Sequence, residues 1–331
     1  MQNNALRAVL AAIASFLMFA ALVSLPFASV PIAYIGLCYG LGLAIAAAIL
    51  TGLLTSVLLS PVLGIVFLLV FLVPSLMLLR QSLLSRPIAS DVARGDGAPS
   101  WDFYPAERLI LMGGGLAAVG TIAIFASVAD TPGGLPEILA QAMYSSPELA
   151  DMVHQLYNTR DFTDFQLIAR LIIITGLAGW PLLLLGNLQI GQALAVLSGK
   201  NLRPTPDYDR LQLPPRLVFL LAGFGIGTLV FDGTLSTLMA IFLALVTSAY
   251  FLLGLAIIHA ISRPWNGRGW LLSALYFLIF IMAWVIIPIA LIGLLDTRFD
   301  FRQLASDGTG KNTNIGSVHS TDDTDKDEEK D

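Results

Sequence analysis

The chain has 331 residues, of which 56% are hydrophobic and 12% are charged, and its formal net charge is −5. This apolar content exceeds what a soluble domain buries, and the apolar residues occur in long blocks that match the hydrocarbon thickness of a bilayer. The short alternating segments of a membrane β-barrel do not occur in runs such as residues 235–261. The sequence therefore predicts an all-α polytopic transmembrane helical bundle and argues against a soluble enzyme.

About eight apolar segments follow one another along the chain, and each is expected to be a membrane-spanning helix. The second segment holds Gly36, Gly40 and Gly42, so it is either one tilted helix or two short helices folded at the glycines, which would give nine spans. Pro181 lies inside the fifth segment and is expected to kink one long helix rather than end it. The segments cover roughly residues 6–25, 32–59, 62–79, 109–128, 167–197, 217–231, 235–261 and 271–294.

The charges of the connecting loops predict the orientation of the helices. Basic residues follow the third, fifth and seventh segments, whereas the connection at residues 129–166 is acidic. By the positive-inside rule, the three basic connections are expected in the cytoplasm and the acidic connection outside. Counting the spans back from these connections puts the N-terminus inside only if residues 32–59 cross twice. The same count puts the C-terminus outside, whereas Arg298 and Arg302 favour the inside.

Two connections are predicted to have structure of their own. After Pro147, apolar residues at helical spacing predict a short amphipathic helix on the outer surface, either packed on its own bundle or acting as a lid or partner site. Residues 203–215, RPTPDYDRLQLPP, predict a rigid cytoplasmic turn or a docking loop, because prolines exclude a helix and charges exclude the bilayer. The apolar residues after Pro147 are Leu149, Met152, Val153 and Leu156.

The polar C-terminal stretch divides the chain into two regions. Residues 304–331 are rich in Gly, Ser, Thr and Asp, so they cannot bury a core and are expected to be a disordered acidic tail. Residues 1–303 form the predicted transmembrane helical domain.

Polar side chains in the fifth segment are the candidates for a binding site. Asn187, Gln189 and Gln192 lie at membrane depth, where an amide needs a hydrogen-bond partner, so they are expected to face the bundle or a cavity. Asn187 and Gln192 lie broadly on one side of the helix, whereas Gln189 is turned well away. Interhelical hydrogen bonding and a small-molecule site both satisfy this pattern.

Small residues four positions apart predict close contacts between helices. Ala8 and Ala12 lie on the first helix, and Gly36 and Gly40 form a GxxxG pair in the second segment. Such pairs let neighbouring backbones approach, either inside the chain or at a subunit interface.

Motifs for catalysis, metal binding and nucleic-acid binding are absent from the sequence. The three histidines lack metal-ligand spacing, and no HExxH, GxSxG or Walker-type pattern occurs. Basic residues sit beside helix ends, where membrane topology already explains them. The sequence therefore predicts a protein that is not an enzyme and has no cofactor, metal or nucleic-acid partner. Transport driven by protons or sodium is disfavoured, because no carboxylate is evident at membrane depth.

Three stretches carry a resemblance to a known family. They are LPFASVPIAYIGLCYGLGLAIAAA, RPTPDYDRLQLP and GLLDTRFDFR. With the order of apolar helices, they resemble the YybS-like family of bacterial membrane proteins, a domain of unknown function, over the chain up to about Gln303. That family is similar to the substrate-binding subunits of energy-coupling-factor vitamin transporters.

The resemblance implies a small-molecule transport fold in the inner (plasma) membrane, in contact with the lipid bilayer. It also implies that an early alanine-rich helix, here with Ala8 and Ala12, faces a membrane protein partner, and that a Gly-rich segment follows. The matching glycines are Gly36, Gly40 and Gly42. A small-molecule-binding or transport-related subunit is therefore expected, with an unknown ligand. The alternative is a non-transporting membrane scaffold or assembly protein.

Overall fold

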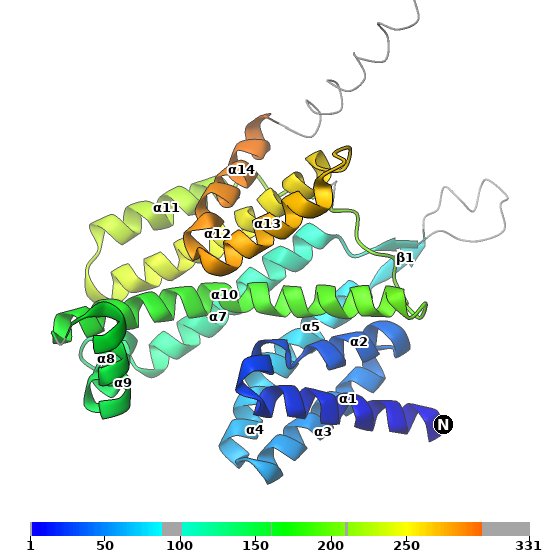
Figure 1. The fold of residues 1–331 in the computed structure, drawn as a ribbon, viewed down its shortest axis with the longest axis horizontal. Coiled ribbons are helices and arrows are strands. Elements are labelled where there is room, and N and C mark those ends of the chain that lie inside the picture. The colour runs from blue at the N-terminus through cyan, green and yellow to red at the C-terminus, as the bar shows by residue number, and fades with distance from the viewer. Residues whose placement is uncertain (1, 88–100, 160, 209–210, 300–331) are drawn as a thin grey trace, which may run out of the picture. The chain divides into compact units, whose positions relative to one another are not determined.

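The computed structural model describes residues 2–87, 101–159, 161–208 and 211–299, and most of them are helical (Figure 1). Helices are the expected outcome for this sequence, because a backbone in hydrocarbon must satisfy its hydrogen bonds within each segment. The all-α bundle predicted from the sequence is confirmed. The chain forms two compact units, Met1–Tyr250 and Phe251–Asp331. The predicted tail, residues 304–331, lies outside the described residues.

The first unit begins with three helices joined by tight connections. The chain turns at Gly40, whose φ of 96° is a conformation that residues with a side chain rarely adopt. Of the two alternatives for residues 32–59, the structure thus shows two short helices folded at a glycine (Figure 1). The elements are α1 (Gln2–Ala20), the 3-10 helix η1 (Leu22–Phe27), α2 (Val30–Tyr39) and α3 (Leu41–Leu58).

The next apolar stretch contains a π-helical turn that ends two residues before a proline. Pro74 has no backbone N–H, so it cannot donate to the carbonyl of Val70, its partner in an α-helix. The indole Nε1 of Trp180 donates to this carbonyl at 3.1 Å. A side chain from a distant part of the chain thus supplies the donor that Pro74 lacks. The elements are α4 (Pro61–Phe67), the π-helix η2 (Leu68–Leu72) and α5 (Val73–Ser82).

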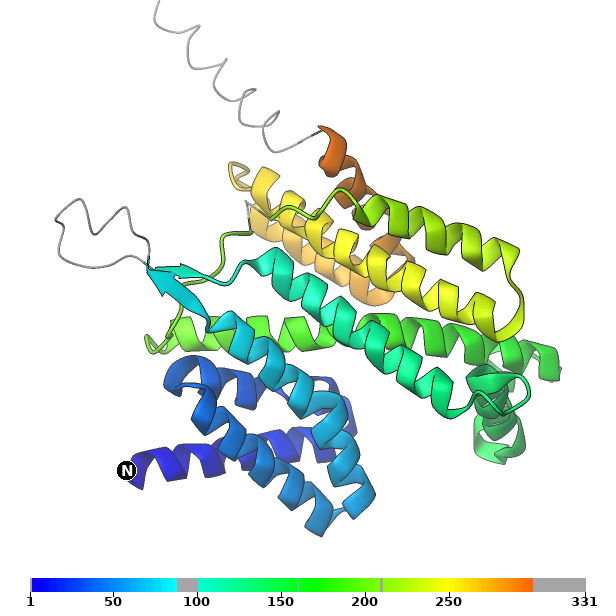
Figure 2. The ribbon, with the colours of Figure 1, turned by 180° about the vertical axis from the view of Figure 1, so that it is seen from behind.

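A two-stranded antiparallel hairpin connects α5 to the next long helix, α7 (Ala106–Ser127) (Figure 2). Its strands are β1 (Ser85–Pro87) and β2 (Trp101–Phe103), and Arg86 lies opposite Asp102. The sequence does not predict this hairpin, since strands of three residues are too short to show alternation. The hairpin brings the end of α5 to the start of α7.

The acidic connection folds into two helices, α8 (Gly134–Ser145) and α9 (Pro147–Tyr157), of which the sequence predicted only α9. Val153 on α9 is buried in a cluster with Met143 and Phe165. The other apolar residues of the predicted face, Leu149, Met152 and Leu156, remain exposed.

The helix after this connection, α10 (Phe162–Leu197), has 36 residues and continues through Pro181, as predicted. The helices α11 (Leu217–Val230) and α12 (Gly233–Ile261) follow it. A tight turn joins them at Asp232 and Gly233, where the glycine has a φ of 59°.

The second unit contains the end of α12 and two short helices, α13 (Arg268–Ile281) and α14 (Ile286–Phe299). The prediction of one continuous helix over residues 271–294 is wrong, because Met282 leaves the helical conformation and a 3-10 turn follows it. Within this unit, a side chain at Gly254 would overlap the backbone carbonyl of Ile289, so the end of α12 and α14 make a close backbone contact.

Among the described residues, six helices are long and apolar enough to cross a membrane. The same residues contain three shorter apolar helices, so the predicted eight spans are not reproduced one by one. Large apolar side chains such as Leu17, Val57 and Leu171 are exposed on the long helices, which suits contact with lipid. The six are Asn3–Ala20, Leu41–Leu58, Pro61–Ser82, Ala106–Ser127, Phe162–Leu197 and Gly233–Ile261, and the three are Val23–Tyr39, Leu217–Val230 and Arg268–Ile281.

Candidate functional site

The three amides of α10 do not converge on one cavity. Asn187 is buried, and its Nδ2 donates to the carbonyl of Pro26 and to Oγ of Ser29, both at 2.8 Å. Gln192 is also buried, and its Nε2 bonds elsewhere, at the end of α10. Gln189 is exposed on another side of the helix. Asn187 therefore holds the turn between α1 and α2 against α10, which matches the expectation of interhelical bonding better than that of a shared ligand site.

The small residues singled out in the sequence lie in different settings. Ala8 and Ala12 are buried within the chain, and the hydroxyl of Thr51 on α3 reaches the carbonyl of Ala12 at 3.5 Å. A side chain at Gly36 would overlap Leu79 on α5. Gly40, in contrast, forms the turn before α3.

Two further glycines complete this comparison. Among the described residues, no atom of another segment lies within 4 Å of a Cβ placed at Gly40 or Gly42. A Cβ at Gly191 on α10 would lie 2.9 Å from Cβ of Ala33 and 3.0 Å from the backbone nitrogen of Tyr34. The structure therefore identifies Gly191 as the close contact between α10 and α2.

Arg203 is the centre of a polar cluster at the end of α10. We call this cluster the Arg203 joint, and its other members are Ser82, Tyr104, Gln192 and Asn201. The side chain of Arg203 is only 5% exposed. Its Nη1 donates to the carbonyl of Ser82 at 2.9 Å and its Nη2 to that of Tyr104 at 3.5 Å. Its own carbonyl accepts from Nε2 of Gln192 at 3.0 Å and from Nδ2 of Asn201 at 2.8 Å. The joint thus ties the end of α5 and the start of α7 to α10.

Burial of the Arg203 joint changes the acidity of its groups. Desolvation lowers the pKa of Arg203, but a guanidinium remains charged at neutral pH. This positive charge lies at the C-terminal end of α5, where the helix dipole favours a cation. The hydroxyl of Tyr208 donates to Oε1 of Gln189. Burial raises the pKa of Tyr208 to about 12, against the opposing effects of Arg203 and of the bond to Gln189. The phenol is therefore a donor at neutral pH.

The loop that begins at Arg203 packs against its own chain. Leu211 and Leu213 are buried, and the backbone N–H of Leu202 donates to the carbonyl of Leu37 on α2 at 2.8 Å. This arrangement fits the expectation of a rigid turn.

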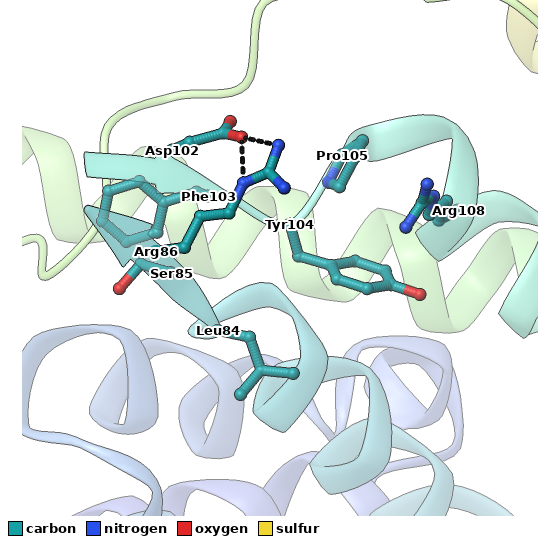
Figure 3. Close-up of a pocket in the computed structure, with 8 residues that line it drawn as sticks. All are labelled: Leu84, Ser85, Arg86, Asp102, Phe103, Tyr104, Pro105 and Arg108. Carbon is teal, nitrogen blue, oxygen red and sulfur yellow. Dashed lines mark hydrogen bonds and ion pairs between the residues drawn. The ribbon is translucent and has the colours of Figure 1, made fainter. Parts of the chain in front are cut away.

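A surface pocket of about 250 Å³ lies beside the joint, between the end of α5, the hairpin and the start of α7 (Figure 3). Figure 3 shows Arg86 and Asp102 joined across the hairpin. Both Nε and Nη2 of Arg86 donate to Oδ2 of Asp102, at 2.9 and 2.8 Å. The pocket is lined by Leu84, Ser85, Arg86, Asp102, Phe103, Tyr104, Pro105 and Arg108.

The pocket carries more positive than negative charge. Arg86 and Arg108 supply two guanidinium groups against the single carboxylate of Asp102. Arg108 is exposed and has no hydrogen-bond or ion-pair partner in the described part of the chain. Such a lining suits a polar ligand with negative charge. In the same described residues, no group of three or more His, Cys, Asp or Glu side chains is placed to hold a metal ion.

The pocket and the Arg203 joint are absent from the sequence prediction for one physical reason. Arg86 and Arg203 belong to basic loops, and the positive-inside rule explains basic loops without any site. Pro74 in α5 gave no indication of the site either, because a proline in an apolar run has no charge or polar side chain. Arg203 itself could have indicated the cluster. An arginine between an apolar helix and a proline-rich loop lies close enough to the last carbonyls of a helix to donate hydrogen bonds to them.

Comparison with known proteins agrees with the membrane character of the chain. Residues 114–297, more than half of the chain, match a family described as predicted membrane protein (DUF2232). Neither the curated proteins nor the solved structures contain a match. The matched range begins inside α7 and ends inside α14, so it includes α10 and Arg203 but not the hairpin or Ser82 and Tyr104, whose carbonyls Arg203 bonds. Together with the apolar helices described above, this match shows that the chain belongs to the DUF2232 family of predicted membrane proteins.

Proposed function

We propose that this protein is a small-molecule-binding, transport-related subunit of a bacterial plasma membrane, and that it is not an enzyme. The observation that supports this function is the pocket between α5, the hairpin and α7, which presents fixed charged groups at the ends of two apolar helices. The resemblance to the YybS-like family, and through it to substrate-binding subunits of energy-coupling-factor transporters, points in the same direction.

The Arg203 joint gives the pocket a physical connection to the membrane helices. Tyr104 lines the pocket, and its carbonyl accepts from Arg203. The same guanidinium holds the end of α5 through Ser82, and the backbone of Arg203 is held by Gln192 on α10. A ligand that displaces Tyr104 would therefore act on α5, α7 and α10 together, as a transport subunit requires.

In this proposal the buried amides of α10 hold helices rather than ligand. Both hydrogens of the Asn187 amide already have acceptors, and the NH₂ group of Gln192 bonds the Arg203 backbone. A ligand at Asn187 would first have to break these bonds. The pocket at the hairpin presents Arg108, which makes no such bond to any residue that the structure describes.

A non-transporting scaffold or assembly protein is the second candidate. The observation that favours it is the internal use of Ala8, Ala12, Gly36 and Asn187, whose contacts lie within the chain and not in a ligand site. Purification in mild detergent followed by identification of bound proteins separates the two functions. An ATP-hydrolysing module would support transport, whereas assembly or division factors would support a scaffold.

The pocket is tested directly by measuring retained small molecules. The full chain is purified in mild detergent, and extracted molecules are identified by mass spectrometry. A Ser85→Trp variant fills the pocket, and Ser145→Trp places the same bulk at an exposed serine elsewhere. We expect the unaltered chain and Ser145→Trp to retain a molecule that Ser85→Trp loses. Equal retention by all three, or retention by none, would overturn the proposed function.

A further inference from the structure

We propose that the pocket between α5, the hairpin and α7 binds a phosphate group, carried by a lipid headgroup or by a free phosphorylated molecule. This inference rests on the proposed function, whose ligand class it specifies. It rests on two guanidinium groups and a helix N-terminus that lie around one small open cavity (Figure 3).

The charges in the pocket leave one cation available to a ligand. Asp102 accepts both hydrogen bonds of Arg86 on a single oxygen, so one negative charge is already compensated. Arg108 has no partner in the described part of the chain. A guanidinium presents its N–H groups as a planar fork that matches two oxygens of a phosphate. Arg108 is therefore the group expected to contact the phosphate directly.

The start of α7 places the positive end of a helix dipole beside the pocket. Pro105 precedes the helix in an extended conformation, and it lines the pocket together with Arg108 in the first turn. The first N–H groups of a helix have no partners within it, and the helix dipole favours an anion at this end. Glu107 lies in the same turn but does not line the pocket. The backbone and the side chain of Arg108 thus favour the same charge on the ligand.

The size and position of the pocket suit a compact anionic group. A volume of about 250 Å³ is smaller than the roughly 300 to 1,000 Å³ typical of sites for drug-sized ligands. The hairpin lies in the first basic connection, the side on which the positive-inside rule places the cytoplasm and on which anionic lipids are concentrated. Leu84 adds an exposed apolar flank beside the charged groups. Lipid phosphates and soluble phosphates both reach such a position.

The test measures binding of two probes to the full chain in detergent at constant ionic strength. The probes are inorganic phosphate and short-chain phosphatidic acid. Arg108→Gln should weaken binding about tenfold, because one charge-assisted hydrogen bond is lost. Arg80→Gln is the matched control, since Arg80 is an exposed arginine near the end of α5 that does not line the pocket. Asp102→Asn should tighten binding, because it removes the opposing charge and frees Arg86.

The outcomes separate the source of the phosphate from the existence of the site. Binding of inorganic phosphate assigns a free phosphorylated molecule, binding of phosphatidic acid alone assigns a lipid headgroup, and each supports the phosphate site. Equal weakening by Arg108→Gln and Arg80→Gln, or binding of neither probe, overturns it. A molecule that is lost in Ser85→Trp but is not displaced by either probe would overturn the phosphate ligand and leave the proposed function standing.

Discussion

Replacing Trp180 with phenylalanine should destabilise the protein by about 1 to 2 kcal/mol. The indole N–H donates to the carbonyl of Val70 at 3.1 Å, and Pro74 cannot supply the helical donor for that carbonyl. Side-chain hydrogen bonds between membrane helices contribute about 0.6 kcal/mol on average and at most about 1.7. The expected loss lies toward the upper end, because the carbonyl of Val70 loses a donor at membrane depth, where water does not replace it.

The structural reason is tested by restoring the missing donor. Pro74→Ala returns an N–H to the position four residues after Val70, so Trp180→Phe should cost little in that background. Reversible unfolding in mixed micelles, followed by circular dichroism, gives the four free energies of this double-mutant cycle. An equal cost of Trp180→Phe with and without Pro74 would refute the hydrogen-bond argument. A negligible cost in the natural background would refute it as well.

Three further predictions concern helix contacts and topology. Asn187→Leu should lower the free energy of unfolding by about 1 to 3 kcal/mol through loss of two hydrogen bonds, whereas Gln189→Leu on the exposed side should cost less, in the same unfolding assay. Gly191→Val should cost about 1 to 3 kcal/mol by overpacking against α2, and an unchanged stability would contradict the close contact. Cysteines introduced at Glu148 and Arg86 should react with a membrane-impermeant reagent from opposite sides, and labelling from one side would refute the topology.

The long helices were predictable because their pattern is set by the thickness of the bilayer. The break at Met282 was not, because a proline has the same local chemistry wherever it lies in an apolar run. Pro181 is buried, and its Cβ lies 3.6 Å from the position that a Cβ would take at Gly113. The helix α10 continues through this proline. Pro288 instead lies in the first turn of α14, where a missing N–H costs nothing, and the run is broken just before it. Packing, which the local sequence does not encode, decides between these outcomes.

The candidate site was less predictable than the fold. The amides of α10 stood out because polar groups are rare in apolar helices, but rarity does not distinguish a ligand site from a bond between helices. Asn187 is paired with the turn that contains Pro26, a residue 161 positions away in the sequence. The pocket is formed by a hairpin whose strands carry no periodic signal, and its position depends on the register that places Arg86 opposite Asp102.

The separation of these partners along the chain has a consequence for biosynthesis. Ser82 and Arg203 are 121 residues apart, and Asn187 and Pro26 are 161 apart. At about 5 to 20 residues per second, the ribosome needs roughly 6 to 32 s to deliver the later partner. During that interval, α1 to α5 are already in the membrane, but Asn187 and Arg203 are not yet there to donate to the carbonyls of Pro26 and Ser82. The first helices should therefore be retained by the insertion machinery or exposed to membrane proteases until α10 arrives, and chains that terminate before α10 should be degraded rapidly.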